Sequence, residues 1–274
     1  MAISKFIPTV WSETLLSELD QEYIGVRNCN RAFEGEIRGK GSVVKIVGVN
    51  NVTVFDYTKD TDMSAPQALT DFEKALTINQ AKAFNFQLDD IDKTQGSPVL
   101  MKTAMKQAAA ALSDEADKYV YSLHTEATED NTITVATLTA NNIVDNIISA
   151  RKMLLKNKVN SNVPTCLEVS PEVAALIIKS RILSGTNAED VIENGSLGKF
   201  IGFDIYVSPN IEVDDSGYYK CFARTKRAFA FAEQLSEVEA YRPESRFADA
   251  VKGLHLYGAK LVYPKEFVLF NVKV

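Results

Sequence analysis

The sequence predicts an α+β fold in which a compact α/β unit is inserted into a framework of long strands and one long helix. Three observations lead to this prediction. Apolar and polar residues alternate over residues 76–89, and apolar residues then recur with helical spacing over residues 98–125. Short helices and strands alternate over residues 131–225, and strand-forming residues dominate the end of the chain. The first strand and the long helix are therefore expected to pack with the last strands.

Length and composition lie in the normal range of globular proteins. The chain has 274 residues, 46% of them hydrophobic and 24% charged, which supports one elaborate domain or two smaller ones. No stretch approaches the roughly 18 consecutive apolar residues that a membrane span requires, and the N-terminus lacks the pattern of a signal peptide. Cys29, Cys166 and Cys221 are far apart and form no CxxC pair, which predicts free, packed thiols in a reducing compartment.

The charge of the chain argues against a protein that grips nucleic acid. The formal net charge is −6, and the 30 lysines and arginines are interspersed among 36 aspartates and glutamates. A protein that neutralises phosphates is expected to carry a basic patch or stripe, and none is visible. If this protein encloses DNA, it is expected to contain the DNA without clamping it.

Residues 1–30 form an apolar arm that looks unlike the rest of the chain. A short helix is expected within it, with Ser12 as the N-cap and Leu15, Leu16 and Leu19 on one face. An apolar arm without a hairpin partner packs on something else. That surface is either the body of the same chain or a neighbouring subunit, and the sequence favours neither.

Residues 33–57 are expected to form an extended hairpin, in which residues 43–47 and 52–55 are strand formers interrupted by glycine-rich turns. A polar stretch at residues 59–68 is then expected to be an exposed loop.

The alternation over residues 76–89 predicts one half-buried strand, after which the period changes to that of a helix. About 28 residues at 1.5 Å each make a rod of roughly 40 Å, which needs a long sheet or a partner to lie on. The apolar stripe of this helix consists of Met101, Ala104, Met105, Ala108, Ala111, Leu112, Tyr119, Val120 and Leu123.

The middle and the end of the chain supply shorter elements. Residues 143–155 form an amphipathic helix, residues 165–169 a short strand, and Ser170 and Pro171 open a further helix as N-cap and first residue. The remaining expected strands are residues 203–207, 229–231, 238–241, 254–263 and 267–272.

Two clusters resemble ligand sites but favour simpler interpretations. The acidic residues at 89–92 lack the spacing of a calcium loop and favour a polar strand-to-helix turn. Gly195, Gly198 and Gly202 match neither a dinucleotide fingerprint nor a phosphate loop, and Lys199 lacks the Walker spacing. These glycines are interpreted as loop residues.

His124 and His255 are the only histidines, and neither lies in a GxSxG, HExxH or zinc-ligand pattern. His255 is more simply a residue on the face of a sheet. We therefore expect no catalytic, cofactor-binding or metal-binding residue and no cofactor.

Several stretches, taken in their order along the chain, carry a resemblance to a known family. They resemble the Hong Kong 97-type major capsid proteins of tailed bacteriophages and prophages, and the resemblance spans nearly the whole chain. Each motif alone is weakly specific. The stretches are residues 32–37 with 41–46 (the extended E-loop), 75–80 and 84–92 with the long helix (the P-domain strand and spine helix), 167–172 and 202–208 (the A-domain), and 246–260 near the end.

The resemblance implies a domain division. The expected parts are an N-terminal arm (1–30), an E-loop (31–70), a P-domain (71–130 and 226–262, with its spine helix at about 98–125) and an A-domain (131–225 and 263–274).

The resemblance also implies a function without catalysis. The protein is expected to self-assemble through hexamers and pentamers into an icosahedral shell that encloses phage double-stranded DNA. Its expected partners are copies of itself, a portal and decoration proteins, with no membrane and no sequence-specific contact to DNA. Its expected location is the virion capsid, after assembly in the cytoplasm of the host bacterium.

Two features depart from some members of that family. The capsid pattern begins close to Met1, so a separate scaffolding protein or scaffold-free assembly is expected. Lys40 or Lys45 would be the E-loop donor of an intersubunit Lys–Asn crosslink, but Gly-Lys-Gly is ordinary turn chemistry and crosslinking is not favoured.

Two other functions remain as alternatives. An encapsulin-like compartment would hold a cargo enzyme in place of DNA. A small α/β enzyme would require a pocket with convergent polar groups in residues 131–225, for which the sequence supplies no motif.

Overall fold

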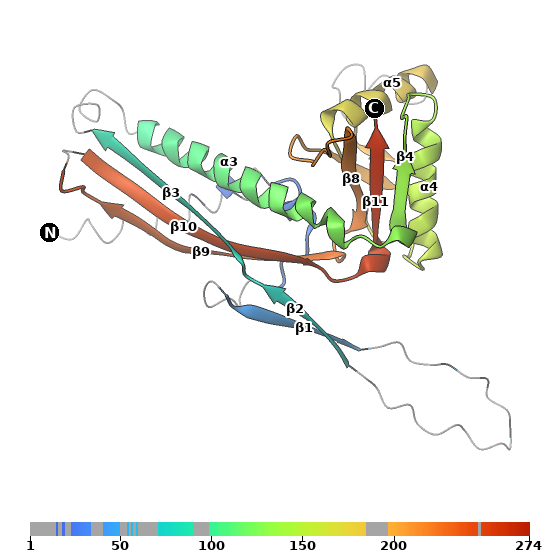
Figure 1. Ribbon diagram of the computed structural model, residues 1–274, viewed down its shortest axis with the longest axis horizontal. Helices are drawn as coiled ribbons and strands as arrows, with labels where there is room; N and C mark the ends of the chain where they lie inside the picture. Colours follow the sequence, from blue (N-terminus) through green and yellow to red (C-terminus); the bar gives the residue numbers. More distant parts are fainter. Residues whose placement is uncertain are drawn as a thin grey trace.

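A long three-stranded sheet, a six-stranded sheet and a projecting two-stranded hairpin make up the chain, seen here in a computed structural model (Figure 1). The structure describes residues 15, 18–19, 23–33, 41–49, 54, 56, 59, 71–89, 99–184, 197–245 and 248–274. The main elements are β1 (Val43–Val49), β2 (Asp71–Thr77), β3 (Gln80–Asp89), α3 (Val99–Ser122), β4 (Thr132–Val135), α4 (Ile143–Lys156), β5 (Thr165–Val169), α5 (Pro171–Ser184), β6 (Lys199–Phe200), β7 (Phe203–Val207), β8 (Tyr218–Thr225), β9 (Phe229–Tyr241), β10 (Ala248–Leu261) and β11 (Phe267–Lys273).

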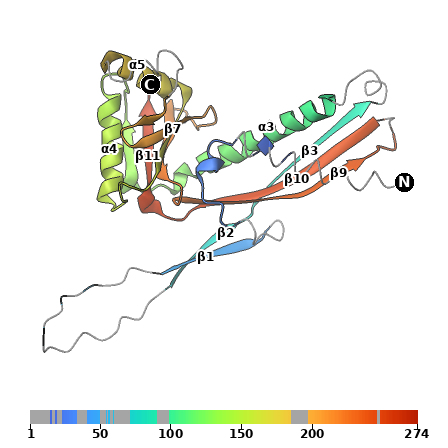
Figure 2. The ribbon, with the colours of Figure 1, turned by 180° about the vertical axis from the view of Figure 1, so that it is seen from behind.

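The long unit consists of α3 lying along an antiparallel sheet with the order β3-β10-β9 (Figures 1 and 2). Helix α3 has 24 residues and is roughly 36 Å long, which confirms the predicted rod. Met105 and Leu112 of the predicted stripe are buried. Ala111 is exposed, contrary to prediction, because the buried stripe runs through Ala109, Leu112 and Ala116 at helical spacing.

The compact unit is a six-stranded mixed sheet with the order β4-β11-β8-β5-β7-β6, and α4 packs on β11 and β8 and also contacts α5. The helices and strands predicted for the middle of the chain are confirmed. The Ser170 hydroxyl accepts a hydrogen bond from the Val173 amide at 3.4 Å, as expected for an N-cap, and Pro171 is the first helical residue. No helix in the described part of the chain is long and apolar enough to cross a membrane.

The projecting hairpin pairs β1 with β2, so the observed partner of β1 lies outside the hairpin predicted for residues 33–57. Val43 lies opposite Thr77 and Val49 lies opposite Asp71, and residues 50–70 join the two strands. Strand β2 is the better partner because its register sets Leu76 opposite Val44 on one buried face. Residues 34–40, 90–98 and 185–196 and nearly all of the predicted polar loop lie outside the described residues.

The base of the hairpin packs on the face of the long sheet that is opposite α3. Tyr257 of β10 points toward α3, where its ring lies 5.6 Å from that of Tyr119. Its neighbour Leu256 therefore points to the other face, where it packs with Val44 and Ile46 of β1. The long unit thus has three layers at this place, which are helix, sheet and hairpin.

The single strand predicted for residues 76–89 is in fact two strands, β2 and β3, which belong to different sheets. The break lies at Ile78 and Asn79, where the chain passes over β10 at Gly258. A Cβ atom on Gly258 would lie 2.3 Å from the backbone oxygen of Thr77, so only glycine fits beneath the crossing. Alternation continues through the break, which is why the sequence showed one strand.

At the end of the chain the strands are longer than predicted. The strands expected at residues 229–231 and 238–241 are parts of one 13-residue strand, β9. Leu254 and His255 of β10 lie opposite Glu237 and Leu235, so β9 has one extra residue at this bulge. The bulge falls between the two predicted strands and interrupts the alternation that the prediction relied on.

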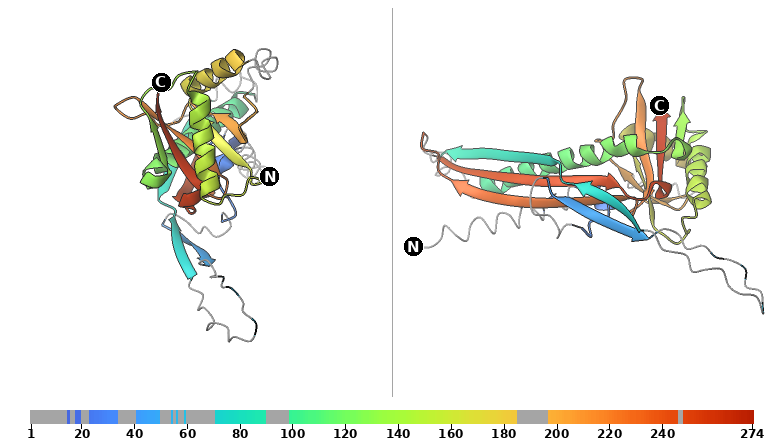
Figure 3. Two further views of the ribbon diagram at one scale, coloured as in Figure 1. Left: turned by 90° about the vertical axis from the view of Figure 1, so that its right-hand side faces the viewer. Right: turned by 60° about the horizontal axis from the view of Figure 1, so that its bottom comes forward.

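Residues 23–31, which we name the strap, settle where this part of the N-terminal arm lies. Leu15, Leu19, Tyr23 and Val26 are buried within the chain's own core. Asn30 forms a parallel bridge with Ala230 of β9, through bonds from Asn30 N to Phe229 O and from Phe231 N to Asn30 O. The strap therefore crosses the chain's own body, at the junction of the two units (Figure 3).

A single aromatic cluster joins the long unit to the compact unit. The ring of Phe222 in β8 lies 4.7 Å from that of Phe267 in β11 and 5.6 Å from that of Phe229 in β9. Tyr121 at the end of α3 packs edge-on against Phe222 at 5.4 Å. The main core is therefore continuous across the junction.

Candidate functional site

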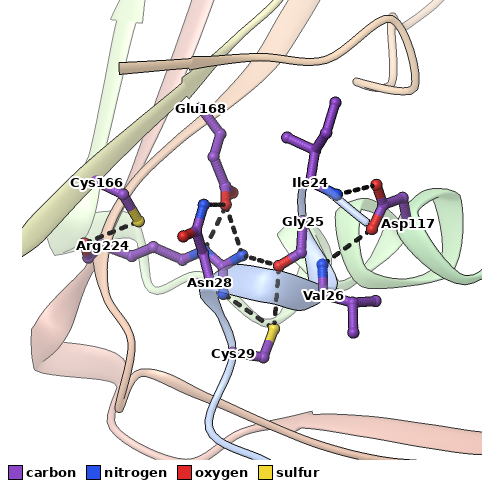
Figure 4. Close-up of polar contacts among 9 residues, drawn as sticks. All are labelled: Ile24, Gly25, Val26, Asn28, Cys29, Asp117, Cys166, Glu168 and Arg224. Atoms are coloured by element: carbon purple, nitrogen blue, oxygen red, sulfur yellow. Dashed lines mark hydrogen bonds and ion pairs between the residues drawn. The ribbon is translucent and has the colours of Figure 1, made fainter. Parts of the chain in front are cut away.

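Charged groups are buried at the junction of the two units, beside the strap (Figure 4). Arg224 of β8 and Glu168 of β5 form an ion pair with both side chains fully buried. The guanidinium donates to both carboxylate oxygens, at 3.1 Å from Nε and 2.8 Å from Nη2. This bidentate geometry is the strongest form of the contact, and it satisfies much of the hydrogen-bonding capacity of both groups.

The strap completes the surroundings of this pair. Arg224 Nη2 also donates to the Gly25 carbonyl at 2.8 Å, and its Nη1 lies 3.2 Å from Cys29 Sγ. The Asn28 amide donates to Glu168 Oε1 at 2.8 Å. Burial raises the pKa of Glu168 above its usual range, and Arg224 and Asn28 act against that rise.

Asp117 of α3 holds the strap from a second side. Its two carboxylate oxygens accept hydrogen bonds from the backbone amides of Ile24 and Val26, both at 2.9 Å. Burial raises the pKa of Asp117, and the two strap amides act against that rise.

Glu233 of β9 holds the strap from a third side. Its carboxylate accepts hydrogen bonds from the Tyr23 hydroxyl at 2.5 Å and from Arg31 Nη2 at 2.5 Å. His255 Nε2 of β10 lies 2.8 Å from the same carboxylate. Burial raises the pKa of Glu233, but the contacts with His255, Tyr23 and Arg31 outweigh it and leave the pKa lowered.

The residues singled out from the sequence lie apart from one another. His255 is a buried residue on the face of the long sheet, as predicted, and its partner is Glu233. His124 is partly buried, 3.2 Å from the Tyr121 carbonyl. Gly198 and Gly202 have positive φ angles of 47° and 79°, which confirms their interpretation as loop residues. The side chains at 89–92 lie outside the described residues, and elsewhere in the described chain no cluster of metal-ligating side chains is found.

The charged residues that matter most at the junction belong to none of the motifs that the sequence shows. Each is a single charged residue within an otherwise apolar strand or helix face, such as Glu168 between Leu167 and Val169. A single charged residue at a position where the apolar periodicity predicts a buried side chain is the signal that could have identified them, since a buried charge requires a partner.

The three cysteines are free and buried, as predicted. Burial raises the pKa of all three thiols, that of Cys221 to about 12. We expect the folded protein to react only slowly with a thiol reagent at about pH 8, and all three thiols to react once urea unfolds it. Counting modified cysteines by mass spectrometry checks this, and fast labelling of any one in the folded protein would contradict it.

The exposed surface offers two features suited to contact with another chain. The hairpin extends away from the body, and its Val43 and Val54 side chains are 51% and 90% exposed (Figure 1). A shallow hollow of about 270 Å³ lies in the long sheet, beside the 37% exposed side chain of Leu254. The hollow is lined by Ala83, Phe84, Asn85, Glu239, Lys252, Gly253 and Leu254.

Comparison with known proteins adds to this geometry. Residues 72–269 match a protein family described as phage capsid protein. A chain from Mycobacterium phage Che8 is 31% identical, with a TM-score of 0.71 and 90% of each chain covered. No protein among the curated sequences matches.

Two more distant structures share the fold. A chain of the bacteriophage PhiM1 mature capsid is 14% identical over 91% of this chain and 87% of its own length, with a TM-score of 0.68. A virus-like particle from Pyrococcus furiosus is 12% identical over 98% of this chain and 100% of its own length, with a TM-score of 0.60.

Proposed function

This chain belongs to the family of phage capsid proteins, and from that premise we propose how its parts build the shell. It is a major capsid protein of the Hong Kong 97 type, and its role is to assemble with copies of itself. The single observation that carries this function is the family match over residues 72–269. A compartment for a cargo enzyme is not favoured, because the matching family is described as phage capsid protein.

The proposal for the assembly is that hexamers and pentamers close into an icosahedral shell around double-stranded DNA. The net charge of −6 supports a wall that encloses DNA without clamping it. The shell forms part of the virion after assembly in the host cytoplasm, together with a portal, a separate scaffolding protein and decoration proteins. Catalysis has no part in this function.

The proposed division of labour follows the two units. The long unit, residues 71–130 and 226–262, forms the P-domain, and the compact unit, residues 131–225 and 263–274, forms the A-domain around the centre of each capsomer. Residues 1–30 form the N-terminal arm, and residues 31–70 form the E-loop. Closed symmetric assembly repeats each modest contact over many neighbours, so the contacts together stabilise the shell.

Electron microscopy of the expressed full chain tests the function. We expect closed shells, or hexamers and pentamers that close into shells with a scaffolding protein. A chain that stays monomeric under all conditions and binds a small metabolite would overturn the proposal. Denaturing gels of the particles test crosslinking, for which only monomer-sized bands are expected.

The hairpin is proposed to reach over an adjacent subunit. A two-stranded hairpin is marginally stable alone in water, and β1–β2 leaves its own body along much of its length (Figure 1). The Val54 side chain would then be covered in the shell although it is 90% exposed in the single chain.

Replacing Val54 by aspartate should reduce the yield of shells while changing the unfolding free energy of the dissociated subunit by less than about 0.5 kcal/mol. The physical reason is that a carboxylate loses its hydration only when the neighbour covers it. Sedimentation measures the yield and urea denaturation measures the stability. The control is Glu129→Gln, a substitution at an exposed position. Lys158 on the compact unit is also exposed, but Lys158→Asp is unsuitable as a control because the backbone there has a positive φ of 65°. Shell yields equal to wild type would contradict the contact.

A further inference from the structure

The strap is held by carboxylates from three elements that belong to different parts of the chain. Asp117 lies on α3 and Glu233 on β9, both in the long unit, whereas Glu168 lies on β5 in the compact unit. Every one of these carboxylates accepts at least one hydrogen bond from the strap, at 2.9 Å or less. The strap therefore connects helix, long sheet and compact sheet to one another through itself.

Gly25 lies at the centre of this arrangement. Its carbonyl accepts from Arg224 of the compact unit, while Ile24 and Val26 on either side donate to Asp117 of the long unit. A Cβ atom on Gly25 would lie 3.1 Å from the Tyr121 hydroxyl and 3.2 Å from Asp117 Oδ1, so the strap backbone lies close against α3. A change in the angle between the units would have to stretch bonds on one side of this residue or the other.

The contacts that the strap makes depend on direction more than apolar packing does. The aromatic cluster of Phe222, Phe229 and Phe267 also joins the units, but much of its stabilisation comes from apolar burial, which is non-directional. The strap's charge-assisted hydrogen bonds at 2.5–2.9 Å fix position and orientation together. The bidentate pair of Arg224 and Glu168 adds geometric specificity at the same place.

We propose that the strap, residues 23–31, fixes the angle between the long unit and the compact unit and thereby sets the curvature of the shell. This proposal rests on the function proposed above, because an angle within one subunit affects curvature only when many copies assemble side by side. Weakening the strap should therefore let subunits of the same sequence join at a wider range of angles.

The test uses particles assembled from the full chain with Asp117→Asn, and with Tyr23→Phe as a milder variant that should fold if the first does not. Asp117→Asn removes the charge that accepts two strap amides, and Tyr23→Phe removes one hydroxyl bond to Glu233 while keeping the ring. Tyr119→Phe is the matched control, because its hydroxyl bonds Asn79 at 3.0 Å outside the strap.

Two measurements are needed for each variant. Hydrogen exchange of the dissociated subunit reports the strap amides, and about tenfold faster exchange is expected in Asp117→Asn, with a smaller rise in Tyr23→Phe. Electron microscopy reports particle diameters, and a wider spread than wild type, with open or tubular forms, is expected in the same order. The control should match wild type in both measurements.

The outcomes separate this inference from the function it rests on. Faster strap exchange with an unchanged spread of diameters would overturn the inference and leave the shell function intact. Unchanged strap exchange in both variants would also overturn it. Failure of the wild-type chain to form any shell would instead remove the function.

Discussion

Replacing Arg224 by methionine should lower the free energy of unfolding of the dissociated subunit by about 3–5 kcal/mol, the usual cost of removing one partner of a buried ion pair. The substitution replaces the guanidinium by a shorter apolar side chain and leaves the Glu168 carboxylate fully buried, with Asn28 as its remaining side-chain donor. It also removes a donor from the Gly25 carbonyl of the strap. Urea denaturation of purified subunits measures the loss.

The pH dependence of this loss gives a second check. Burial already raises the pKa of Glu168, and removing Arg224 removes the charge that most opposes the rise. A carboxyl whose folded pKa lies above its unfolded pKa stabilises the fold at low pH, and this contribution disappears as pH rises through the folded pKa. The deficit of the variant relative to wild type should therefore be larger at about pH 8 than at about pH 5.

The double variant Glu168→Met with Arg224→Met is the matched control. Replacing both members of a buried pair by apolar residues of similar volume is often close to neutral. We expect it to recover a large part of the loss, short of the bonds to Gly25 and Asn28. A single variant as stable as wild type, or a double variant less stable than the single, would contradict this account of the junction.

The sequence predicted the elements of this fold better than their partners. Helix α3 and the strands β5, β7 and β11 of the compact unit follow from local periodicity, which depends only on neighbours along the chain. The strands β4, β6 and β8 of the same sheet were not predicted. The partner of β1 could not be predicted in this way, because residues 52–55 and β2 both have strand composition. The choice between them is made by the fit of Val44 and Leu76 against the long sheet, and this is a tertiary contact.

The buried charged contacts at the junction could not be predicted from the sequence for a different reason. Asp117, Glu168 and Glu233 are spread over the chain, and each looks like an isolated charge until the fold brings them to the strap. Their pattern has no fixed spacing, since it is set by the packing of two units and not by one element. The family resemblance predicted the parts of the subunit and contained no information on how this chain ties them together.

Gly258→Ala is expected to have the second largest effect, because the crossing of the hairpin over the long sheet leaves no room for a side chain. The added Cβ atom would lie 2.3 Å from the Thr77 oxygen and 3.0 Å from its carbonyl carbon, and both are backbone atoms that no rotamer change can move. Overpacking of this kind costs roughly 1–3 kcal/mol, which urea denaturation of the subunit measures. The hairpin should shift relative to the sheet, so shell yield should fall by more than the loss of stability explains.

Gly253→Ala, on the same strand, is the matched comparison, because it makes the same substitution at a position with different neighbours. There the added Cβ atom would lie 2.4 Å from Phe84 Cε1, a side-chain atom at the far end of a rotatable ring. Phe84 is only partly buried, so the ring can turn away at the expense of its stacking on Phe86. If the hairpin crossing is the constraint, Gly253→Ala should lower the free energy of unfolding by less than Gly258→Ala does. A larger loss at Gly253 than at Gly258 would contradict a constraint at the crossing. Since β2 continues directly into β3 at this crossing, the direction in which the hairpin leaves the body is set by the contact between Gly258 and Thr77.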